Sequence, residues 1–150
     1  MLNLKAMDNM RVRIAKDFVW EMSHRLPFHT GGCKNIHGHS YKLRVEAEGE
    51  TDSNGMIIDY YDLQAIVEPL VSKFDHAFLV DEQDNIMLDF LKINDFKHLV
   101  VGCTTTAENI ANYIFNEIKP SFLKFDNIDI LKVRLHETKD VFAELEVKLR

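Results

Sequence analysis

The stretch that decides the fold is HGHSYKLRVEAEG, residues 37–49. Apolar and charged residues alternate along it: Tyr41, Leu43, Val45 and Ala47 against Lys42, Arg44, Glu46 and Glu48. Successive side chains of a strand point to opposite faces, so this pattern predicts a strand with one buried face. His37 and His39 lie at its start and share the face of the apolar residues.

A second strand is predicted just upstream, from Val12 to about Arg25. Its even positions carry most of the apolar residues, Ile14, Phe18, Trp20 and Met22, and His24 has the same parity. We expect the two strands to pair antiparallel. The connection contains Pro27, Gly31 and Gly32 and is too long for a tight hairpin, which makes it a candidate for function.

Two helices are predicted downstream, where the apolar spacing becomes helical. The first has Asp59 as its N-cap and runs to Phe74, with Pro69 expected to kink or shorten it. The second opens with a capping box at residues 105–108 and ends at Pro120. Residues 83–102 show no clear period, apart from an apolar run at 87–91 and a strand-like segment at 99–101.

Two last strands are predicted over residues 131–136 and 141–149, which again alternate. The order ββααββ predicts an α+β fold, with a four-stranded antiparallel sheet and two helices on one face. Residues 1–10 are expected to be a flexible leader, and residues 11–150 a single domain.

Composition limits the partners of the chain. A net charge of −6 argues against nucleic acid and anionic membranes, which both favour a basic surface. Cys33 and Cys103 could form at most one disulfide, so the chain is not a disulfide scaffold. We find neither a secretory signal nor an apolar run of membrane-spanning length, so a cytoplasmic location is expected.

The three histidines form a candidate metal site. His37 and His39 are two residues apart on one strand face, and His24 ends the neighbouring strand with matching parity. In an antiparallel pair the three rings would converge at one end of the sheet. Three imidazoles with a fourth position open are typical of catalytic zinc. The alternative is that the three histidines are unrelated. If the HGH motif were the only evidence, this alternative would be the better interpretation.

Further residues could carry proton transfer. Cys33 is a possible fourth ligand, a reactive thiol near the metal, or an inert small side chain. Asp75 and His76 follow the first helix, and a carboxylate beside an imidazole can fix its tautomer and form a proton relay. From the residues alone, a histidine bonding to helix-end carbonyls is the more common arrangement.

Six segments carry a resemblance to a known family. They are FVWEMSHRL at 18–26, CKNIHGHSYKLRVEAEG at 33–49, GMIIDYYDL at 55–63, FDHAFL at 74–79, TAEN at 106–109 and RLHET at 134–138. In these segments the chain resembles the 6-pyruvoyltetrahydropterin synthases, and most of all the bacterial 6-carboxytetrahydropterin synthases of queuosine biosynthesis. It departs from them at Thr104-Thr105, where many relatives have Asn-Pro, and in the length of 83–102.

The resemblance implies a tunnelling fold (T-fold) and a set of site residues. It implies that His24, His37 and His39 bind Zn²⁺ and that Cys33, Asp75 and His76 transfer protons. It implies that Glu137 anchors the pterin ring, with help from Thr106 and Glu108. From the residues alone, Glu137 could be a surface carboxylate at a strand end, and Glu108 the last member of the capping box. Lys34, Arg25 and His29 are candidates for contacting a triphosphate.

The resemblance also implies the reaction and the assembly. The expected substrate is 7,8-dihydroneopterin triphosphate, converted to 6-carboxy-5,6,7,8-tetrahydropterin, acetaldehyde and triphosphate by a homo-oligomer built as a dimer of trimers. One alternative is a pyruvoyl-forming synthase, which eliminates triphosphate without losing carbon. Others are a non-catalytic pterin- or metal-binding module and a structural oligomer without metal. Residues 83–102 and Cys103 receive no role.

Overall fold

The computed structural model describes residues 10–150. They form one sheet in the order β4-β3-β1-β2-β5-β6. Its strands are β1 (Arg11–His24), β2 (His37–Glu50), β3 (Ala77–Asp81), β4 (His98–Val101), β5 (Ile128–His136) and β6 (Phe142–Lys148). The helices are α1 (Tyr60–Phe74), α2 (Asn85–Ile93) and α3 (Ala107–Phe122), with a short 3₁₀ turn, η1 (Gly32–Lys34), between β1 and β2.

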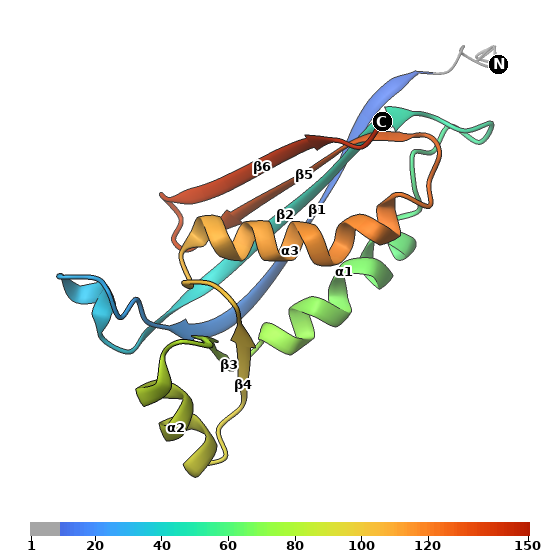
Figure 1. Cartoon of the computed structure of the whole chain (residues 1–150). Coiled ribbons are helices and arrows are strands. Elements are labelled where there is room, and N and C mark those ends of the chain that lie inside the picture. Colours follow the sequence, from blue (N-terminus) through green and yellow to red (C-terminus); the bar gives the residue numbers. More distant parts are fainter. Residues whose placement is uncertain (1–9) are drawn as a thin grey trace.

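The long β1–β2 pair is the frame of the sheet. It is antiparallel along its whole length, and β5 and β6 extend it on the β2 side, also antiparallel. α1 and α3 lie side by side across one face of these strands (Figure 1). The predicted antiparallel strands and the placement of both helices on one face are therefore confirmed.

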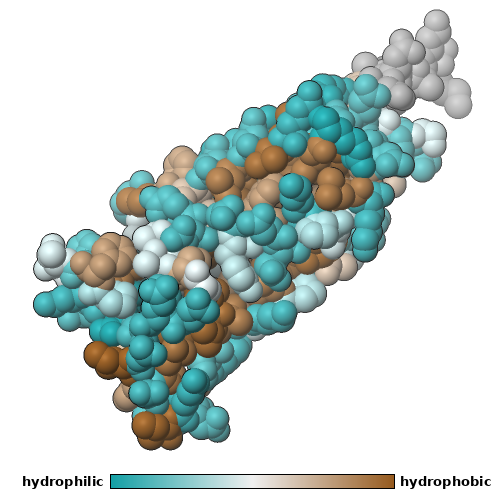
Figure 2. Space-filling view, in the orientation of Figure 1, coloured by the Kyte–Doolittle hydropathy of each residue, from teal (hydrophilic) through white to brown (hydrophobic). Residues whose placement is uncertain are grey.

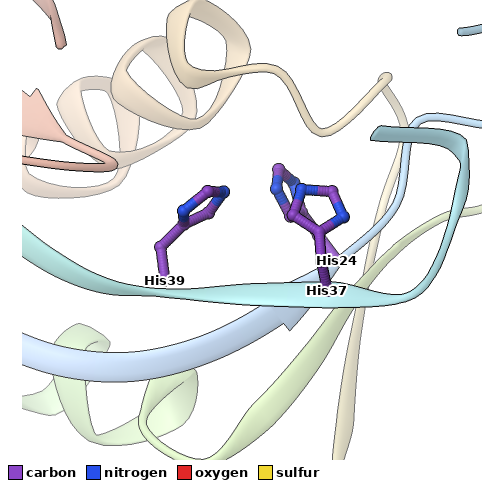
Figure 3. A group of neighbouring side chains, drawn as sticks. All are labelled: His24, His37 and His39. Atoms are coloured by element: carbon purple, nitrogen blue, oxygen red, sulfur yellow. The ribbon is translucent and has the colours of Figure 1, made fainter. Parts of the chain in front are cut away.

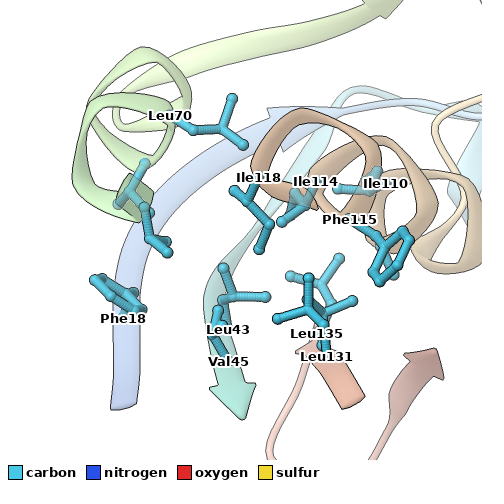
Figure 4. Packing of buried hydrophobic residues seen from close by; sticks show 14 of the residues in the cluster. Phe18, Leu43, Val45, Leu70, Ile110, Ile114, Phe115, Ile118, Leu131 and Leu135 are labelled. Carbon is cyan, nitrogen blue, oxygen red and sulfur yellow. The ribbon is translucent and has the colours of Figure 1, made fainter. Parts of the chain in front are cut away.

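The core lies between that sheet face and the two helices. Figure 4 shows Leu43 and Leu135 of the sheet facing Ile114 and Ile118 of α3, and all four are at most 2% exposed. Burying a side chain of this size stabilises the fold by roughly 1.5–3 kcal/mol. The apolar parity of β2 and β5 is thus what attaches the helices to the sheet.

The sheet has six strands where the sequence predicted four. β3 pairs with β1 only at Met22 and Ser23, and β4 pairs with β3; both pairings are parallel. The first four residues of β3 are all buried, so the strand has no alternation to reveal it. Its pairing, moreover, depends on contacts that are distant in sequence.

A third helix, α2, occupies the segment that showed no clear period. Phe78 and Val80 of β3 join a small cluster with Met87, Leu88 and Leu91 of α2, whereas Leu79 belongs to the main core. Neighbouring residues of a strand face opposite sides, so α2 packs on the sheet face opposite to α1 and α3. Its outer residues Ile86 and Ile93 are exposed, and Figure 2 shows apolar surface at this end of the molecule.

The helix ends differ in part from the prediction. Asp59 caps α1 as predicted, but α1 continues through Pro69, and α3 continues past Pro120 to Phe122. The N-cap of α3 is Thr106, which accepts a hydrogen bond from the amide of Asn109, so the capping-box prediction was wrong by one residue. None of the helices in residues 10–150 is long and apolar enough to cross a bilayer.

Most of the predicted leader, residues 1–9, lies outside the described residues. Its last residue, Met10, exchanges hydrogen bonds with Thr51. The Met10 amide donates to Thr51 Oγ1 at 3.3 Å, and the Thr51 amide donates to the Met10 carbonyl at 3.0 Å. Met10 is therefore attached to the fold.

An ion pair between Arg25 and Asp84 joins the end of β1 to the start of α2. Arg25 Nε and Nη2 donate to the two carboxylate oxygens at 2.7 and 2.5 Å, and Asp84 also caps α2 by accepting from the Met87 amide. The Asp84 side chain is 5% exposed. The hydrogen bonds from Arg25 lower the pKa of this carboxyl below its usual value.

The variant Asp84→Asn tests this pair, because asparagine can still cap the helix but carries no charge. Hydrogen bonds to charged groups contribute about 1.5–3 kcal/mol, so we expect a loss of that order in unfolding free energy at neutral pH. A carboxyl group whose pKa is lower in the folded than in the unfolded state stabilises the fold at pH values above its unfolded pKa. This stabilisation is lost as the pH falls through the folded-state pKa. The unfolding free energies of the two proteins, measured in urea, should therefore approach each other as the pH falls below the ordinary pKa of an aspartate, about 3.9. A difference that persists unchanged in acid would contradict this assignment.

Candidate metal centre

Three histidine rings converge where β1 ends and β2 begins. His24 lies directly opposite His37 in the strand register, and His39 is the next residue of β2 on the same face. One ring nitrogen from each residue lies within 4.8 Å of the other two. Figure 3 shows the rings rising from the two strands toward a common point. The convergence predicted from strand parity is present.

The hydrogen bonding of His24 leaves one nitrogen for a metal. His24 is 1% exposed, and its Nδ1 lies 2.8 Å from the carbonyl oxygen of Thr105. A carbonyl can only accept, so Nδ1 carries the proton and Nε2 is an unprotonated acceptor. This buried Nε2 has no hydrogen-bond partner in residues 10–150. Burial lowers the pKa of His24 to about 4, so the ring is neutral near pH 7.

The other two rings fit the same role. Nδ1 of His37 donates to the carbonyl of Asn35 at 2.8 Å, which again leaves Nε2 free to accept. Burial lowers the pKa of His39, which favours its neutral form. Neutral imidazole is the form that binds metals. The three residues could therefore hold a transition-metal ion, and the compact ligand group in residues 10–150 contains no fourth residue.

Gly38 lets the two strands approach closely at this point. A Cβ built on Gly38 would lie 2.9 Å from the backbone oxygen of Met22 and 3.1 Å from Ser23 Oγ. Any larger residue would push β1 away from β2 and separate His24 from His37. The glycine is therefore part of the geometry that brings the rings together.

Glu137 lies beside the three histidines, immediately after the end of β5. Its Oε1 is 3.8 Å from His24 Nε2 and accepts a hydrogen bond from the Tyr41 hydroxyl at 3.4 Å. The side chain is 21% exposed, so the carboxylate faces the centre while retaining access to solvent. Burial, and then the negative charge of Glu137, raise the pKa of Tyr41, whose hydroxyl is therefore a neutral donor.

The start of α3 borders the centre through its backbone. Thr105 is 2% exposed; its carbonyl orients His24, and its hydroxyl donates to the Arg25 carbonyl at 3.1 Å. Thr106 caps the helix, and the exposed Glu108 lies in its first turn, where a negative charge favours the helix dipole. The contact of Thr105 with His24 could not be predicted from the sequence, because a backbone carbonyl leaves no signal in side-chain chemistry.

Cys33 lies in η1, half-buried, and is not a member of the compact ligand group. Of its three possible roles, that of a fourth ligand is not supported by the geometry.

The three residues predicted as possible triphosphate contacts have different surroundings. Arg25 is bound to Asp84, Nδ1 of His29 accepts from the Gly31 amide, and Lys34 ends the 3₁₀ turn.

Asp75 and His76 form a hydrogen-bonded pair at the end of α1. His76 Nδ1 lies 2.9 Å from Asp75 Oδ1, and the His76 side chain is 76% exposed. The Glu21 amide donates to the same carboxylate, and this bond and the one from His76 lower the pKa of Asp75. His76 and His39 line one cavity of about 590 Å³, but His76 is not in the compact ligand group. The ring therefore bonds to the carboxylate and not to a helix-end carbonyl.

Fold and site together define an α+β domain with a candidate three-histidine metal centre at the end of its central strand pair. Residues 13–148 match the family described as 6-pyruvoyl tetrahydropterin synthase, and the chain belongs to this family. It is 37% identical over 142 residues to a 6-carboxy-5,6,7,8-tetrahydropterin synthase of Haemophilus influenzae, covering 89% of this chain and 98% of the relative. A putative enzyme of the same name from Archaeoglobus fulgidus is 32% identical over 138 residues, which cover 92% of this chain and 96% of the relative.

Solved structures share the fold. A 6-pyruvoyl tetrahydropterin synthase from Caenorhabditis elegans superimposes with a TM-score of 0.70 at 24% identity, covering 95% of this chain and all of the other. The uncharacterised protein WS1659 of Wolinella succinogenes gives a TM-score of 0.77 at 18% identity, covering 94% and 99%. At these identities the likeness concerns the fold alone.

Proposed function

We propose that this protein is a zinc-dependent 6-carboxytetrahydropterin synthase of queuosine biosynthesis. It would convert 7,8-dihydroneopterin triphosphate to 6-carboxy-5,6,7,8-tetrahydropterin, acetaldehyde and triphosphate. The observation that carries the proposal is the buried, unpartnered Nε2 of His24, next to two further imidazoles and one carboxylate. The names of the two curated relatives support the choice of reaction.

The donor set favours zinc. All-imidazole sites suit zinc and other late transition metals better than hard cations such as magnesium. When bound, zinc would acidify the hydroxyls of the substrate side chain and stabilise negative charge on them. The backbone carbonyls of Thr105 and Asn35 orient two of the rings, as is usual for metal-binding histidines.

Glu137 is proposed to anchor the pterin ring. An aminopyrimidinone presents two adjacent N–H donors, and a carboxylate can accept both at once. Its position beside His24 would fix the ring next to the metal. Thr106 and Glu108 stand at the start of α3, directly after Thr105, whose carbonyl contacts His24, and are proposed to assist.

Cys33 and the Asp75–His76 pair are proposed to move protons between the ring and the side chain. Asp75 holds the His76 ring by its Nδ1, which leaves Nε2 to exchange a proton. Because His76 is exposed and outside the ligand group, we propose that it serves a centre shared between chains of a homo-oligomer, a dimer of trimers. β1 pairs with β2 along one edge, but along its other edge it pairs with β3 only at Met22 and Ser23. From Arg11 to Glu21 this second edge has no strand partner within residues 10–150 and could pair with another copy.

The proposal is tested by assaying products with metal-free and zinc-reconstituted protein. With zinc, incubation with 7,8-dihydroneopterin triphosphate should release acetaldehyde and triphosphate in equal amounts. Thorough chelation should stop the release, and added zinc should restore it. Triphosphate without acetaldehyde would identify a pyruvoyl-forming synthase, whereas neither product would indicate a non-catalytic pterin- or metal-binding module.

A further inference from the structure

The Tyr41 hydroxyl is a buried polar group beside the metal centre. Tyr41 is 0% exposed, and its ring is held on two sides. The Trp20 ring stacks on it with centroids 5.6 Å apart and planes 9° apart, and the His39 ring meets it edge-on at 5.4 Å. The packing of the core therefore fixes where the hydroxyl lies.

The hydroxyl has one hydrogen-bond partner in residues 10–150, Oε1 of Glu137 at 3.4 Å. This is longer than the usual O–H···O distance of about 2.7–2.8 Å, so the bond restrains the carboxylate without fixing it rigidly. The same Oε1 lies 3.8 Å from Nε2 of His24, the unpartnered ligand atom. Glu137 Oε1 is therefore placed between the hydroxyl and the metal centre.

Glu137 is close enough to become a metal ligand itself. In a tetrahedral zinc site with ligand distances of about 2.0–2.1 Å, neighbouring ligand atoms are roughly 3.3 Å apart. The 3.8 Å spacing from His24 exceeds this by about 0.5 Å. Glu137 nevertheless stays outside the compact group, in which every ligand atom lies within 4.8 Å of the others. A rotation of the carboxylate toward His37 and His39 would be needed to bring it in.

Such a rotation would have two consequences. A site of three histidines and one carboxylate has four protein ligands, which is the closed arrangement of structural zinc and leaves no position for a reactant. It would also occupy an oxygen with which the proposed function binds the pterin ring. A working site of this kind needs something to keep the carboxylate free.

We infer that Tyr41 is a positioning residue, whose hydroxyl holds the Glu137 carboxylate off the metal and directed at the ligand. The metal part of this inference rests only on the three-histidine centre, and the ligand part rests on the proposed function. Without the hydroxyl, the carboxylate turns to the metal. The centre then binds metal more tightly and pterin more weakly.

The test is Tyr41→Phe, which keeps the aromatic ring and removes only the hydroxyl. The dissociation constant for Zn²⁺, measured by competition with a chelator, should fall by about tenfold, the lower end of the effects known for groups around metal ligands. X-ray absorption of the zinc-loaded variant should show a carboxylate oxygen that the wild type lacks. The dissociation constant of zinc-loaded protein for 6-methylpterin, a pterin ring without the reactive chain, should rise by about tenfold, since lost hydrogen bonds to charged groups have effects of this size.

Two further variants separate this inference from general damage. Tyr113→Phe removes a hydroxyl from another aromatic residue, which meets Phe74 edge-on, and should change neither constant. In Tyr41→Phe combined with Glu137→Gln the competing carboxylate is gone, so the gain in zinc affinity should disappear. Fluorescence of Trp20, the single tryptophan, reports whether the ring stack is intact.

The inference is overturned if Tyr41→Phe binds Zn²⁺ with unchanged or lower affinity while the Trp20 signal is preserved. It is also overturned if the gain persists in the double variant, since the gain would then not come from Glu137. Failure of the proposed function has different signatures. If the protein binds no pterin, wild-type protein does not bind 6-methylpterin at all; if it binds pterin without the proposed reaction, the product assay above shows this. In both cases the zinc measurements still decide the role of Tyr41.

Discussion

Replacing His24 by asparagine is expected to abolish tight metal binding and, with it, the proposed turnover. The asparagine amide can still donate to the Thr105 carbonyl as Nδ1 of His24 does, but it has no counterpart of Nε2, the nitrogen free for the metal. Losing a ligand should lower the affinity for zinc by more than the roughly 10–100-fold seen when a group that orients a ligand is changed. Because metal-ion catalysis supplies several kcal/mol, kcat should fall by about 10³-fold or more.

The measurements are zinc content after gel filtration and the rate of acetaldehyde release. His98→Asn is the matched control, because Nδ1 of His98 also bonds to a backbone carbonyl, that of Phe96 at 2.7 Å, but His98 is not in the ligand group. It should keep both zinc and activity. A His24→Asn protein that retains stoichiometric zinc and full rate would remove the metal centre from the mechanism.

Replacing Cys33 by alanine is expected to stop turnover while leaving fold and metal intact. Cys33 is half-buried in η1, and its side chain donates no hydrogen bond in residues 10–150; its carbonyl holds the loop by accepting from the Leu26 amide at 2.8 Å. Alanine keeps that backbone bond. General acid–base groups contribute about 10²–10⁴-fold, so kcat should fall by that factor with little change in zinc content.

Cys103→Ala provides the comparison. Cys103 is the other half-buried cysteine. It lies in the connection between β4 and α3 and packs against the main core. Its replacement should cost some stability and leave kcat unchanged. Loss of zinc in Cys33→Ala would instead mean that the thiol belongs to the metal site, and an unchanged kcat would favour a non-catalytic binding module.

Strand parity made much of the site predictable. His24, His37 and His39 were assigned to one face because side chains alternate along a strand, and this rule depends only on local backbone geometry. The frame of four antiparallel strands and two helices followed from the same kind of local pattern. Glu137 was expected at the site only from the family resemblance, and its carboxylate does lie beside His24.

Other features had no local signature. β3 escaped prediction because its first four residues are all buried and show no alternation. The strand-like segment at 99–101 does lie in β4, but its parallel pairing with β3 could not be predicted. α2 escaped prediction because its apolar face packs on β3, in a cluster with no clear period in the sequence. The pairing of Arg25 with Asp84, which occupies a candidate phosphate contact, joins residues 59 positions apart.

The sequence by itself determined which residues share a face, the order of the main elements and the three candidate metal ligands. Only the tertiary structure decided that the Thr105 carbonyl fixes the His24 tautomer and that the Tyr41 hydroxyl meets Glu137. Side-chain direction repeats every two residues in a strand and every 3.6 residues in a helix, so the spacing of apolar residues in the sequence reveals it. Contacts between residues about 80 or more positions apart depend on how the whole chain packs, and the chemistry of single residues does not encode them.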